Sequence, residues 1–201
     1  MAFLNALFTA MLDNNLVFAQ LIGMVGVMLI AERPRRAMPF AAKLACCVLA
    51  SGVLGSLLYA GYLAPWGVGY LAPVAFALIG FAVAAAMACV HAFGKPADVR
   101  AAALREAGLI AVNVVLVAAP MDNALAVDGA TATLEGMLGT CVGAAAGVWL
   151  AVVLYSSVRA RVDENGLVPH AMRGLPISLV TASLMALAFT CVAGIAGGLF
   201  V

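Results

Sequence analysis

No formal charge occurs between Lys43 and Lys95, where the chain reads LACCVLASGVLGSLLYAGYLAPWGVGYLAPVAFALIGFAVAAAMACVHAFG (residues 44–94). An apolar helix of about 20 residues crosses a bilayer, so this run is long enough for two such helices. The break between them is predicted in GYLAPWGVGY (61–70), which is rich in glycine and aromatic residues. Tyrosine and tryptophan favour the membrane–water interface. The run therefore predicts a helical hairpin within a membrane.

The whole chain has the same character. Of its 201 residues, 66% are hydrophobic and 9% are charged, with a mean hydropathy of +1.15. A soluble domain carries about 25% charged residues, so a soluble globular enzyme is excluded. The apolar runs are unbroken rather than alternating, which excludes an outer-membrane barrel. A net charge of +1 leaves no basic field for binding nucleic acid.

These patterns predict an all-α membrane protein with one integral membrane domain over residues 1–201. Charged residues and glycine-rich or proline-rich segments separate the apolar runs. The predicted architecture has six transmembrane helices, at about 4–31, 38–62, 70–94, 105–126, 133–158 and 174–198.

The first predicted helix contains Asp13-Asn14-Asn15, which divides it into a short N-terminal piece and a second piece, Leu16–Ala31. Polar residues are costly in hydrocarbon unless they face protein or a water-filled cavity. One interpretation is a broken helix that lines a functional cavity. The other is that the helix starts after these residues and leaves them at the interface.

The fourth predicted helix contains Asn113 and is followed by Pro120-Met121-Asp122-Asn123, so it also looks short or interrupted. Helices one and four hold corresponding places in two three-helix halves, about 1–94 and 95–201. Paired interrupted helices are typical of inverted repeats with a site at the membrane midplane. We therefore expect two inverted repeats in which Asn14, Asn15 and Asn113 line a protein-enclosed site.

Basic residues follow the first, third and fifth predicted helices and are absent from the other loops and both termini: Arg33, Arg35, Arg36, Lys95, Arg100, Arg105, Arg159, Arg161 and Arg173. The positive-inside rule places these loops in the cytoplasm and both termini outside. Lys43 is expected to extend its long side chain towards the basic side. Four acidic residues are predicted on the outer side, namely Asp13, Asp122, Asp128 and Glu135. They either attract cations there or are simply solvated loop acids.

No catalytic residues are predicted, because the chain contains no phosphate-binding loop and no HExxH motif. The five cysteines lie in apolar runs without a CxxC pair. They are interpreted as buried small hydrophobic residues, with a metal site made from some of them as the alternative. Gly139, Gly143 and Gly147 form a stripe that permits close helix approach, within the protein or to a partner.

Three segments carry a resemblance to a known family. NNLVFAQLIGMVGVMLIAERPRRAM (14–38) resembles the first span of the Rnf and Nqr membrane subunits RnfA, RnfE, NqrD and NqrE. VPHAMRGLPISLVTASLMALAF (168–189) is similar to the last loop and span of the RnfA type. LIAVN (109–113) fits the fourth span of the family. The predicted N-out orientation fits RnfA and NqrE rather than the inverted RnfE and NqrD.

The resemblance implies an integral membrane subunit of an ion-translocating electron-transport complex, in a bacterial or archaeal cytoplasmic membrane. Such complexes couple electron flow between ferredoxin or quinone and NAD(H) to movement of Na⁺ or H⁺. The implied partners are an inverted RnfE/NqrD-type subunit, further Rnf/Nqr subunits that carry flavins and Fe–S clusters, and membrane lipid.

The family also implies a [2Fe–2S] cluster, held in mid-membrane by two cysteines from each subunit of the pair. Those positions align here with Val25, shortly after Gly23, and with Val114, directly after Asn113. Valine cannot ligate iron, whereas such clusters need thiolates. We expect no cluster or other cofactor on this chain and a dry, packed pocket at the valines. In the alternative, cysteines from other spans replace the lost ligands.

In the last basic loop, Pro169, Arg173 and Gly174 are predicted to form a structural junction before helix six. Arg173 caps carbonyl groups or pairs with acids there, and Gly174 allows close chain approach. The alternative is a solvated arginine that serves only the positive-inside pattern.

Two other functions remain open at this point. The first is a stand-alone transporter of ions or small molecules on the same inverted repeat. The second is a membrane scaffold for peripheral redox subunits. Co-purification with flavin and ferredoxin-like subunits distinguishes a complex subunit or scaffold from a transporter, which would purify as a functional homodimer.

Overall fold

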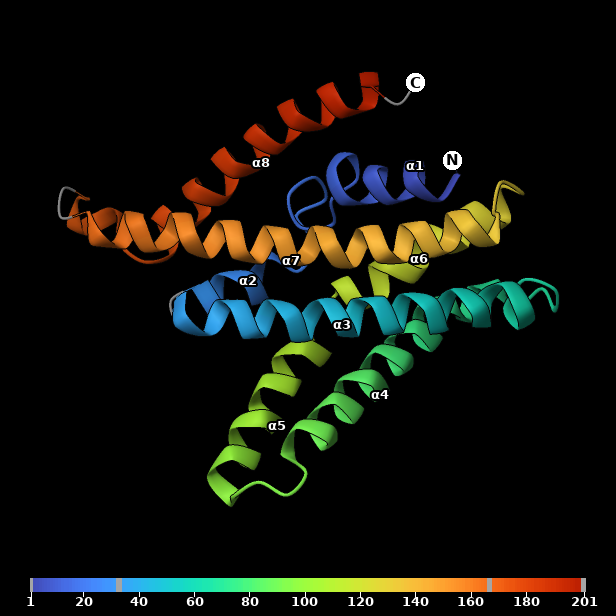
Figure 1. Ribbon diagram of the computed structural model, residues 1–201, viewed down its shortest axis with the longest axis horizontal. Helices are drawn as coiled ribbons and strands as arrows, with labels where there is room; N and C mark the ends of the chain where they lie inside the picture. The colour runs from blue at the N-terminus through green and yellow to red at the C-terminus, as the bar shows by residue number, and fades with distance from the viewer. Residues whose placement is uncertain (1, 32–33, 166–167, 200–201) are drawn as a thin grey trace.

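Helices make up almost all of the chain in the computed structural model, which describes residues 2–31, 34–165 and 168–199 (Figure 1). No strand occurs in these ranges, which confirms the predicted all-α class. The α-helices are α1 (Ala2–Phe8), α2 (Met24–Ala31), α3 (Pro34–Leu58), α4 (Ala72–Ala92), α5 (Ala97–Ala111), α6 (Val115–Asp128), α7 (Leu134–Glu164) and α8 (Leu175–Leu199). Single turns of π-helix extend α1 and α3, at Thr9–Asp13 and Tyr59–Leu63, and 3₁₀ turns lie at Gly69–Leu71 and His170–Met172.

Four described stretches are long and apolar enough to cross a membrane: Ala37–Leu63, Gly69–Ala92, Ala97–Asp128 and Leu134–Glu164. Two shorter apolar helices, Ala2–Asp13 and Leu175–Cys191, lie at the two ends of the chain. The prediction of a membrane protein with several apolar helices is therefore confirmed.

The helices α3 and α7 pack side by side along the long axis of the molecule (Figure 1). On one side of α7 lies α1, and α8 leans away beyond it. On the far side of α3, α4 and α5 form a hairpin that projects from the bundle. The helices α3, α4 and α7 all contact α6. The core of the molecule is therefore the contact between α3 and α7 with α6 against both.

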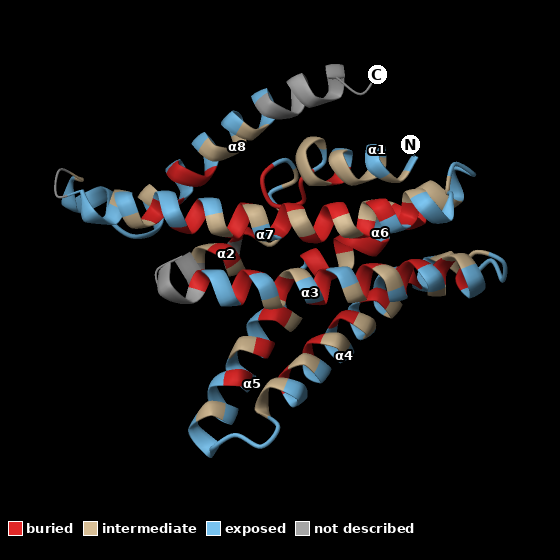
Figure 2. Cartoon of the chain, viewed as in Figure 1, coloured by how far each residue is buried: buried red, intermediate tan, exposed pale blue. Residues whose placement is uncertain are grey.

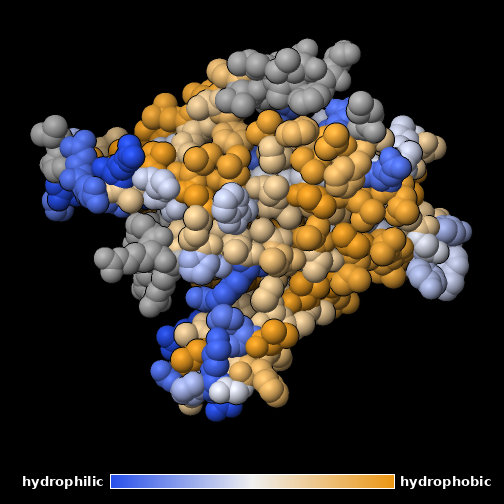
Figure 3. Space-filling view, viewed as in Figure 1, coloured by the Kyte–Doolittle hydropathy of each residue, from blue (hydrophilic) through white to orange (hydrophobic). Residues whose placement is uncertain are grey.

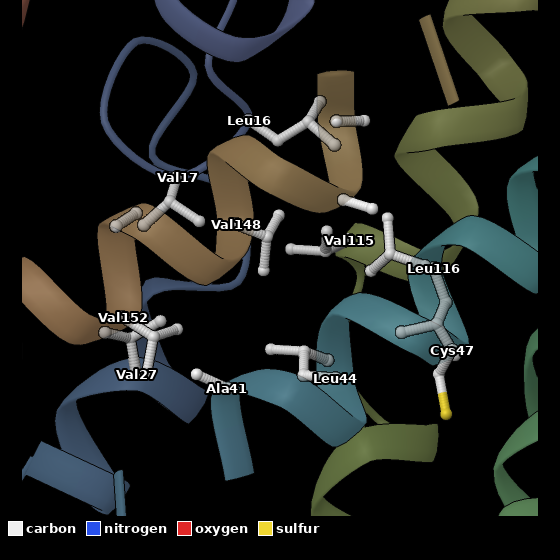
Figure 4. Close-up of a cluster of buried hydrophobic side chains, with 14 of the residues drawn as sticks. Leu16, Val17, Val27, Ala41, Leu44, Cys47, Val115, Leu116, Val148 and Val152 are labelled. Atoms are coloured by element: carbon white, nitrogen blue, oxygen red, sulfur yellow. The ribbon is translucent and has the colours of Figure 1, made fainter. Parts of the chain in front are cut away.

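The core consists mainly of aliphatic side chains, together with Phe18, Phe40 and Tyr155, and most of its residues come from α2, α3, α6, α7 and the segment between α1 and α2. Figure 2 shows where buried positions lie along the helices, and Figure 4 shows side chains of the core, among them Leu16, Val27, Leu44, Leu116 and Val148. Val148 and Val115 are fully buried and lie near the centre of the cluster. Contacts between apolar side chains are non-directional and do not fix where the backbone bends. The positions of the bends depend on the hydrogen bonds described below.

The outer surface is also apolar. On α4, Val74, Leu78, Phe81 and Val90 are each at least 60% exposed. Figure 3 shows a broad hydrophobic surface between hydrophilic regions at the end of α7 and at the α4–α5 turn. A helix that is apolar all round suits a lipid environment rather than water.

Two predicted helix boundaries are wrong, because the charged residues there do not end the helices. The helix α7 continues to Glu164 rather than stopping near residue 158, so Arg159 and Arg161 are helical. The helix α5 begins at Ala97 rather than near residue 105, with Asp98 in its first turn. Charges mark where a helix leaves the hydrocarbon, whereas hydrogen bonding continues beyond that point.

The predicted helical piece Leu16–Ala31 is wrong over its first half, because α2 begins only at Met24. Two residues in the preceding segment have positive φ angles, Leu21 at 55° and Gly23 at 74°. These left-handed conformations are incompatible with a right-handed helix.

The fourth apolar stretch is interrupted beside Asn113, one of the two places that the sequence suggested. The interruption lies at residues 112–114, between α5 and α6, whereas Pro120 is inside α6. A proline removes one helical hydrogen bond but does not always end a helix. Gly55 of α3 faces the Pro120 ring, and an added Cβ atom would lie 2.6 Å from Pro120 Cβ. The glycine makes room for the proline within the bundle.

Candidate functional site

The two interrupted segments meet at Gly23 and Asn113. A Cβ atom added to Gly23 would overlap the Asn113 side chain, and one added to Gly26 would lie 2.8 Å from Asn113 Nδ2. The φ angle of Gly23 is +74°, a conformation that glycine adopts at little cost. The structure thus brings together two of the residues that were assigned to the site from the sequence.

Asn113 is buried, with 6% of its surface exposed. Its Oδ1 atom accepts a hydrogen bond of 3.2 Å from the Val115 amide, and its carbonyl accepts one of 3.2 Å from Leu116. These bonds satisfy amide groups that the start of α6 would otherwise leave free. The Nδ2 atom of Asn113 is buried and has no hydrogen-bond partner among the described residues.

Both half-helices begin at this contact, α2 immediately after Gly23 and α6 two residues after Asn113. The N-terminal end of a helix carries a partial positive charge from its aligned peptide dipoles. Two such ends directed at one place favour a negatively charged or electron-rich group there.

Asn15 shapes the break that follows α1. It is completely buried, and its Oδ1 atom accepts hydrogen bonds from the amides of Val17 and Phe18 at 3.0 and 3.1 Å. Its Nδ2 atom donates to the Met11 carbonyl at 2.8 Å. Asparagine commonly closes turns by such bonds to its own backbone. Asn15 therefore lies in the protein interior, where it shapes the segment between α1 and α2.

Asn14 lies elsewhere and is exposed on the isolated chain. Its Nδ2 atom donates to Asp122 Oδ2 at 3.3 Å, and its Oδ1 atom accepts from Gln20 Nε2 at 2.7 Å. These bonds link the first break to α6 at a point different from the Gly23–Asn113 contact. The three asparagines therefore contact three different sets of residues.

The acids expected on the outer side are partly engaged in the structure. Asp122 accepts from Asn14, and the Tyr59 hydroxyl donates one bifurcated hydrogen bond to the two carboxylate oxygens of Asp128, at 2.8 and 2.9 Å. One carboxylate oxygen of Asp13 is buried and finds no partner in the described part of the chain. Glu135 lies in the first turn of α7, where a negative charge favours the helix dipole.

The aligned cluster positions are occupied by apolar side chains. Val114 is 59% exposed and its neighbour Val112 is 83% exposed, so both face outward from the isolated chain. The backbone of Val25 belongs to α2, but its side chain lies outside the described residues, as do Arg33 and the side chains of Arg35 and Arg36. A packed pocket at Val114 would need atoms from outside this chain.

At the two aligned positions, Val25 and Val114, the side chains do not fit a [2Fe–2S] cluster, because valine has no atom that can ligate iron. Cys47 and Cys141 are buried, whereas Cys46, Cys89 and Cys191 are exposed on the isolated chain. Within residues 2–31, 34–165 and 168–199, no three His, Cys, Asp or Glu side chains gather in a way that would hold a metal ion. We therefore derive no chemical step through such a cluster on this chain.

The predicted junction before the last helix is a compact set of hydrogen bonds. Arg173 Nε donates to the Val168 carbonyl at 3.2 Å, and the Met172 amide donates to the Pro169 carbonyl at 2.9 Å. Gly174 has φ +86° and no neighbour within 4 Å of an added Cβ atom, so its backbone conformation explains the glycine.

Arg159 belongs to this junction, although the sequence pattern predicted it in a loop. It is 5% exposed, and its Nη2 atom donates to the Gly174 carbonyl at 3.4 Å. Its Nη1 atom lies 2.9 Å from Asp163 Oδ1. The signal available in the sequence was the i,i+4 spacing of Arg159 and Asp163, which places the pair on one helix face.

A second buried polar cluster was missed. Asn123 Nδ2 donates to Ser56 Oγ at 2.8 Å, to the Met137 carbonyl at 3.1 Å and to Cys141 Sγ at 3.2 Å. This amide connects α6 to α3 and α7 within the core. No sequence pattern signals the cluster, because its members lie in three different apolar helices.

Lys43 does not simply reach towards solvent, because its Nζ atom lies 2.5 Å from Glu106 Oε2 of α5. The two side chains are 21% and 33% exposed. A charge within an apolar helix requires a partner, so Lys43 itself indicated in the sequence that such a partner exists. The ion pair connects α3 to the α4–α5 hairpin.

The glycine stripe of α7 receives the first half-helix. Cβ atoms added to Gly139, Gly143 and Gly147 would meet backbone atoms of Phe3, Leu7 and Met11, respectively. At Gly139 the distance to the Phe3 carbonyl oxygen would be 2.5 Å. Of the two uses that the sequence left open, the structure shows packing within the chain.

Comparison with protein families matches residues 3–196 to a family described as "Rnf-Nqr subunit, membrane protein". The chain is 31% identical over 193 residues to one subunit of the ion-translocating oxidoreductase complex of Alcanivorax borkumensis, covering 94% of this chain and 95% of the relative.

Two further relatives are also subunits of ion-translocating redox complexes. The chain is 26% identical over 181 residues to one subunit of the Na⁺-translocating ferredoxin:NAD⁺ oxidoreductase complex of Acetobacterium woodii, covering 90% of this chain and 91% of the relative. Over a shorter stretch of 54 residues, it is 41% identical to one subunit of the Na⁺-translocating NADH-quinone reductase of Chlamydia trachomatis, covering 27% and 22% of the two chains.

Proposed function

The chain belongs to the Rnf-Nqr family of membrane subunits, and we therefore propose that it is an integral membrane subunit of an ion-translocating electron-transport complex. The complex would couple redox chemistry between ferredoxin or quinone and NAD(H) to translocation of Na⁺ or H⁺. The names of the relatives in Alcanivorax borkumensis and Acetobacterium woodii support this assignment.

The observation that carries the proposal is the family match over residues 3–196, together with the contact between the two helix breaks. In a bilayer, backbone groups freed by a helix break must be satisfied by protein or water. Hydrogen bonds to the Asn15 and Asn113 side chains do this at both breaks. These three hydrogen bonds support a role for the two breaks in a membrane-embedded site.

The proposed architecture has six crossings in two inverted repeats, about 1–94 and 95–201. The first crossing consists of α1, the break and α2. The fourth consists of α5, its break and α6, and the sixth is α8. The two breaks at corresponding places support this arrangement, since interrupted helices mark the binding region of many inverted-repeat proteins.

We further propose that both termini lie outside a bacterial or archaeal cytoplasmic membrane, with the basic loops inside. Reporter domains fused after Gly129 and after Glu164 test this topology. A reporter after Gly129 is expected to show external activity, and one after Glu164 internal activity. External activity from the fusion after Glu164 would contradict the topology.

The proposed partner is an inverted RnfE/NqrD-type subunit, packed against the outward surface beside Val112 and Val114. Both side chains are apolar and exposed on the isolated chain, which supports a contact there. We propose that this chain carries no [2Fe–2S] cluster, and that flavins and Fe–S clusters belong to other subunits of the complex.

Affinity purification of the chain from its native membrane tests the proposed function. We expect flavin-containing and ferredoxin-like subunits to co-purify, and the reconstituted complex to drive ion uptake into vesicles on addition of reductant. Purification as a functional homodimer would favour the stand-alone transporter. Co-purification without any redox-driven ion uptake would favour the scaffold.

A further inference from the structure

A cavity of about 340 Å³ lies where α7 ends and α8 begins. It is lined by Val162, Asp163, Asn165, Val168, Arg173 and Ile177. Its volume is at the lower end of the range for small-molecule sites. Neither the helix breaks nor the proposed electron-transport role uses this cavity.

Among the described residues at the cavity, two arginines, Arg159 and Arg173, accompany one acid, Asp163, which leaves a net charge of +1 for these three side chains. Asp163 lies 2.9 Å from the buried Arg159, so its negative charge is offset by that arginine. The Arg173 side chain instead bonds to a neutral group, because its Nε atom donates to the Val168 carbonyl at 3.2 Å. The bond holds the guanidinium at the cavity wall, and guanidinium groups match phosphate oxygens in geometry.

The start of α8 adds a second favourable feature for an anion. Ile177, in the first turn of α8, is part of the cavity lining. The first amide groups of a helix have no partners within the helix and carry partial positive charge. Pro176 has no amide N–H, so at this end of α8 the Leu175 and Ile177 amides supply the partial positive charge near the cavity.

The length of α7 places the cavity at the depth of lipid headgroups. With 31 residues and a rise of about 1.5 Å per residue, α7 is about 46 Å long, whereas the hydrocarbon layer is about 30 Å thick. The last turns of α7 therefore extend beyond the hydrocarbon. Figure 3 shows that the surface changes from hydrophobic to hydrophilic towards this end of α7.

Apolar side chains continue from the cavity along both helices. On α7, Val158 and Leu154 lie four and eight residues before Val162, on the same helix face. On α8, Val180 and Leu184 lie three and seven residues after Ile177. These four side chains are all partly exposed, at 37%, 38%, 41% and 61%, respectively.

We propose that this cavity binds the phosphodiester headgroup of a membrane phospholipid, with Arg173 paired to the phosphate. The acyl chains would then lie along the apolar faces of α7 and α8. The net positive charge of Arg159, Arg173 and Asp163 matches the single negative charge of a phosphodiester. The lipid would bind where α8 diverges from α7 (Figure 1) and support the last helix there.

Lipid binding to the delipidated full chain in detergent, followed by native mass spectrometry, tests this proposal. The probes are phosphatidylglycerol, phosphatidylethanolamine, diacylglycerol of matched chain length, and glycerophosphate. We expect both phospholipids to bind in preference to diacylglycerol and glycerophosphate. Equal binding of diacylglycerol would show that only the acyl chains are recognised. Equal binding of glycerophosphate would show a site for free anions, and either result would overturn the proposal.

Arginine variants localise the site. Arg173→Gln is expected to weaken phospholipid binding about fivefold, the effect of one arginine near a phosphate surface. Arg161→Gln is the matched control, because Arg161 is exposed near the same helix end but is not among the cavity-lining residues. Equal losses in the two variants would overturn the proposal in favour of general surface charge. If Arg173→Gln fails to fold, the wild-type comparison of the four probes still decides the outcome.

Discussion

Replacing Gly143 by alanine is expected to destabilise the chain severely, because the added methyl group would overlap the Leu7 carbonyl oxygen. A backbone atom cannot turn aside as a flexible side chain does, so the first half-helix would have to move away from α7. We expect a cost of about 3 kcal/mol, at the upper end for overpacked interiors. Thermal unfolding in detergent would then show a midpoint lower by about 10 °C.

The matched control is Gly108→Ala. Gly108 is also in an α-helix, and an added Cβ atom there meets nothing within 4 Å. Alanine is a better helix former than glycine by about 1 kcal/mol, so this variant is expected to be at least as stable as the wild type. Equal stability of the two variants would mean that α1 does not pack on the glycine stripe.

Asn15→Leu is expected to destabilise the chain by a similar amount. Leucine is of similar size but accepts no hydrogen bond, so the amides of Val17 and Phe18 would remain buried without a partner. The Met11 carbonyl would also lose its bond from Nδ2. Each unsatisfied buried group costs about 1–3 kcal/mol, and we expect a total loss of about 3 kcal/mol. Thermal unfolding and proteolysis of the segment after α1 would both report the change.

Asn14→Leu is the control for this variant. The side-chain amide of Asn14 bonds to the side chains of Asp122 and Gln20, and the residue is exposed. Removing these bonds leaves no buried backbone amide unsatisfied, so a cost below about 1 kcal/mol is expected. If Asn14→Leu were as damaging as Asn15→Leu, the assignment of Asn15 as the residue that shapes the break would be wrong.

Much of the fold was predictable because the bilayer imposes a simple pattern. The charge-free run between Lys43 and Lys95 predicts a hairpin, and the structure has α3 and α4 there with a turn after Leu63. Membrane spans are recognised by apolar length alone, so these elements were recognisable without knowing their neighbours.

Helix breaks were harder to position than helices. The polar pair Asn14-Asn15 correctly indicated the first break, but the helix was predicted to continue from Leu16. In the structure, the segment stays irregular to Gly23, because Asn15 closes a turn and Leu21 adopts a positive φ angle. For the second break, the sequence suggested both Asn113 and Pro120, and the structure has the break at residues 112–114, after α5 ends at Ala111.

Contacts between distant helices were not predictable from the sequence. The bonds of Asn123 to Ser56 and Cys141, and the Lys43–Glu106 ion pair, join residues that are between 18 and 67 positions apart. A polar residue in an apolar helix indicates that a partner exists, but not which residue it is. Only the helix arrangement identifies these partners.

The central claim is that this chain provides the broken-helix site of an Rnf/Nqr-type complex without thiolate ligands. The direct test is iron analysis and electron paramagnetic resonance of the chain purified with the proposed RnfE/NqrD-type partner and reduced with dithionite. We expect no [2Fe–2S] signal that depends on this chain. The claim is contradicted by a stoichiometric [2Fe–2S] signal that disappears when any one of its cysteines is replaced by serine, namely Cys46, Cys47, Cys89, Cys141 or Cys191.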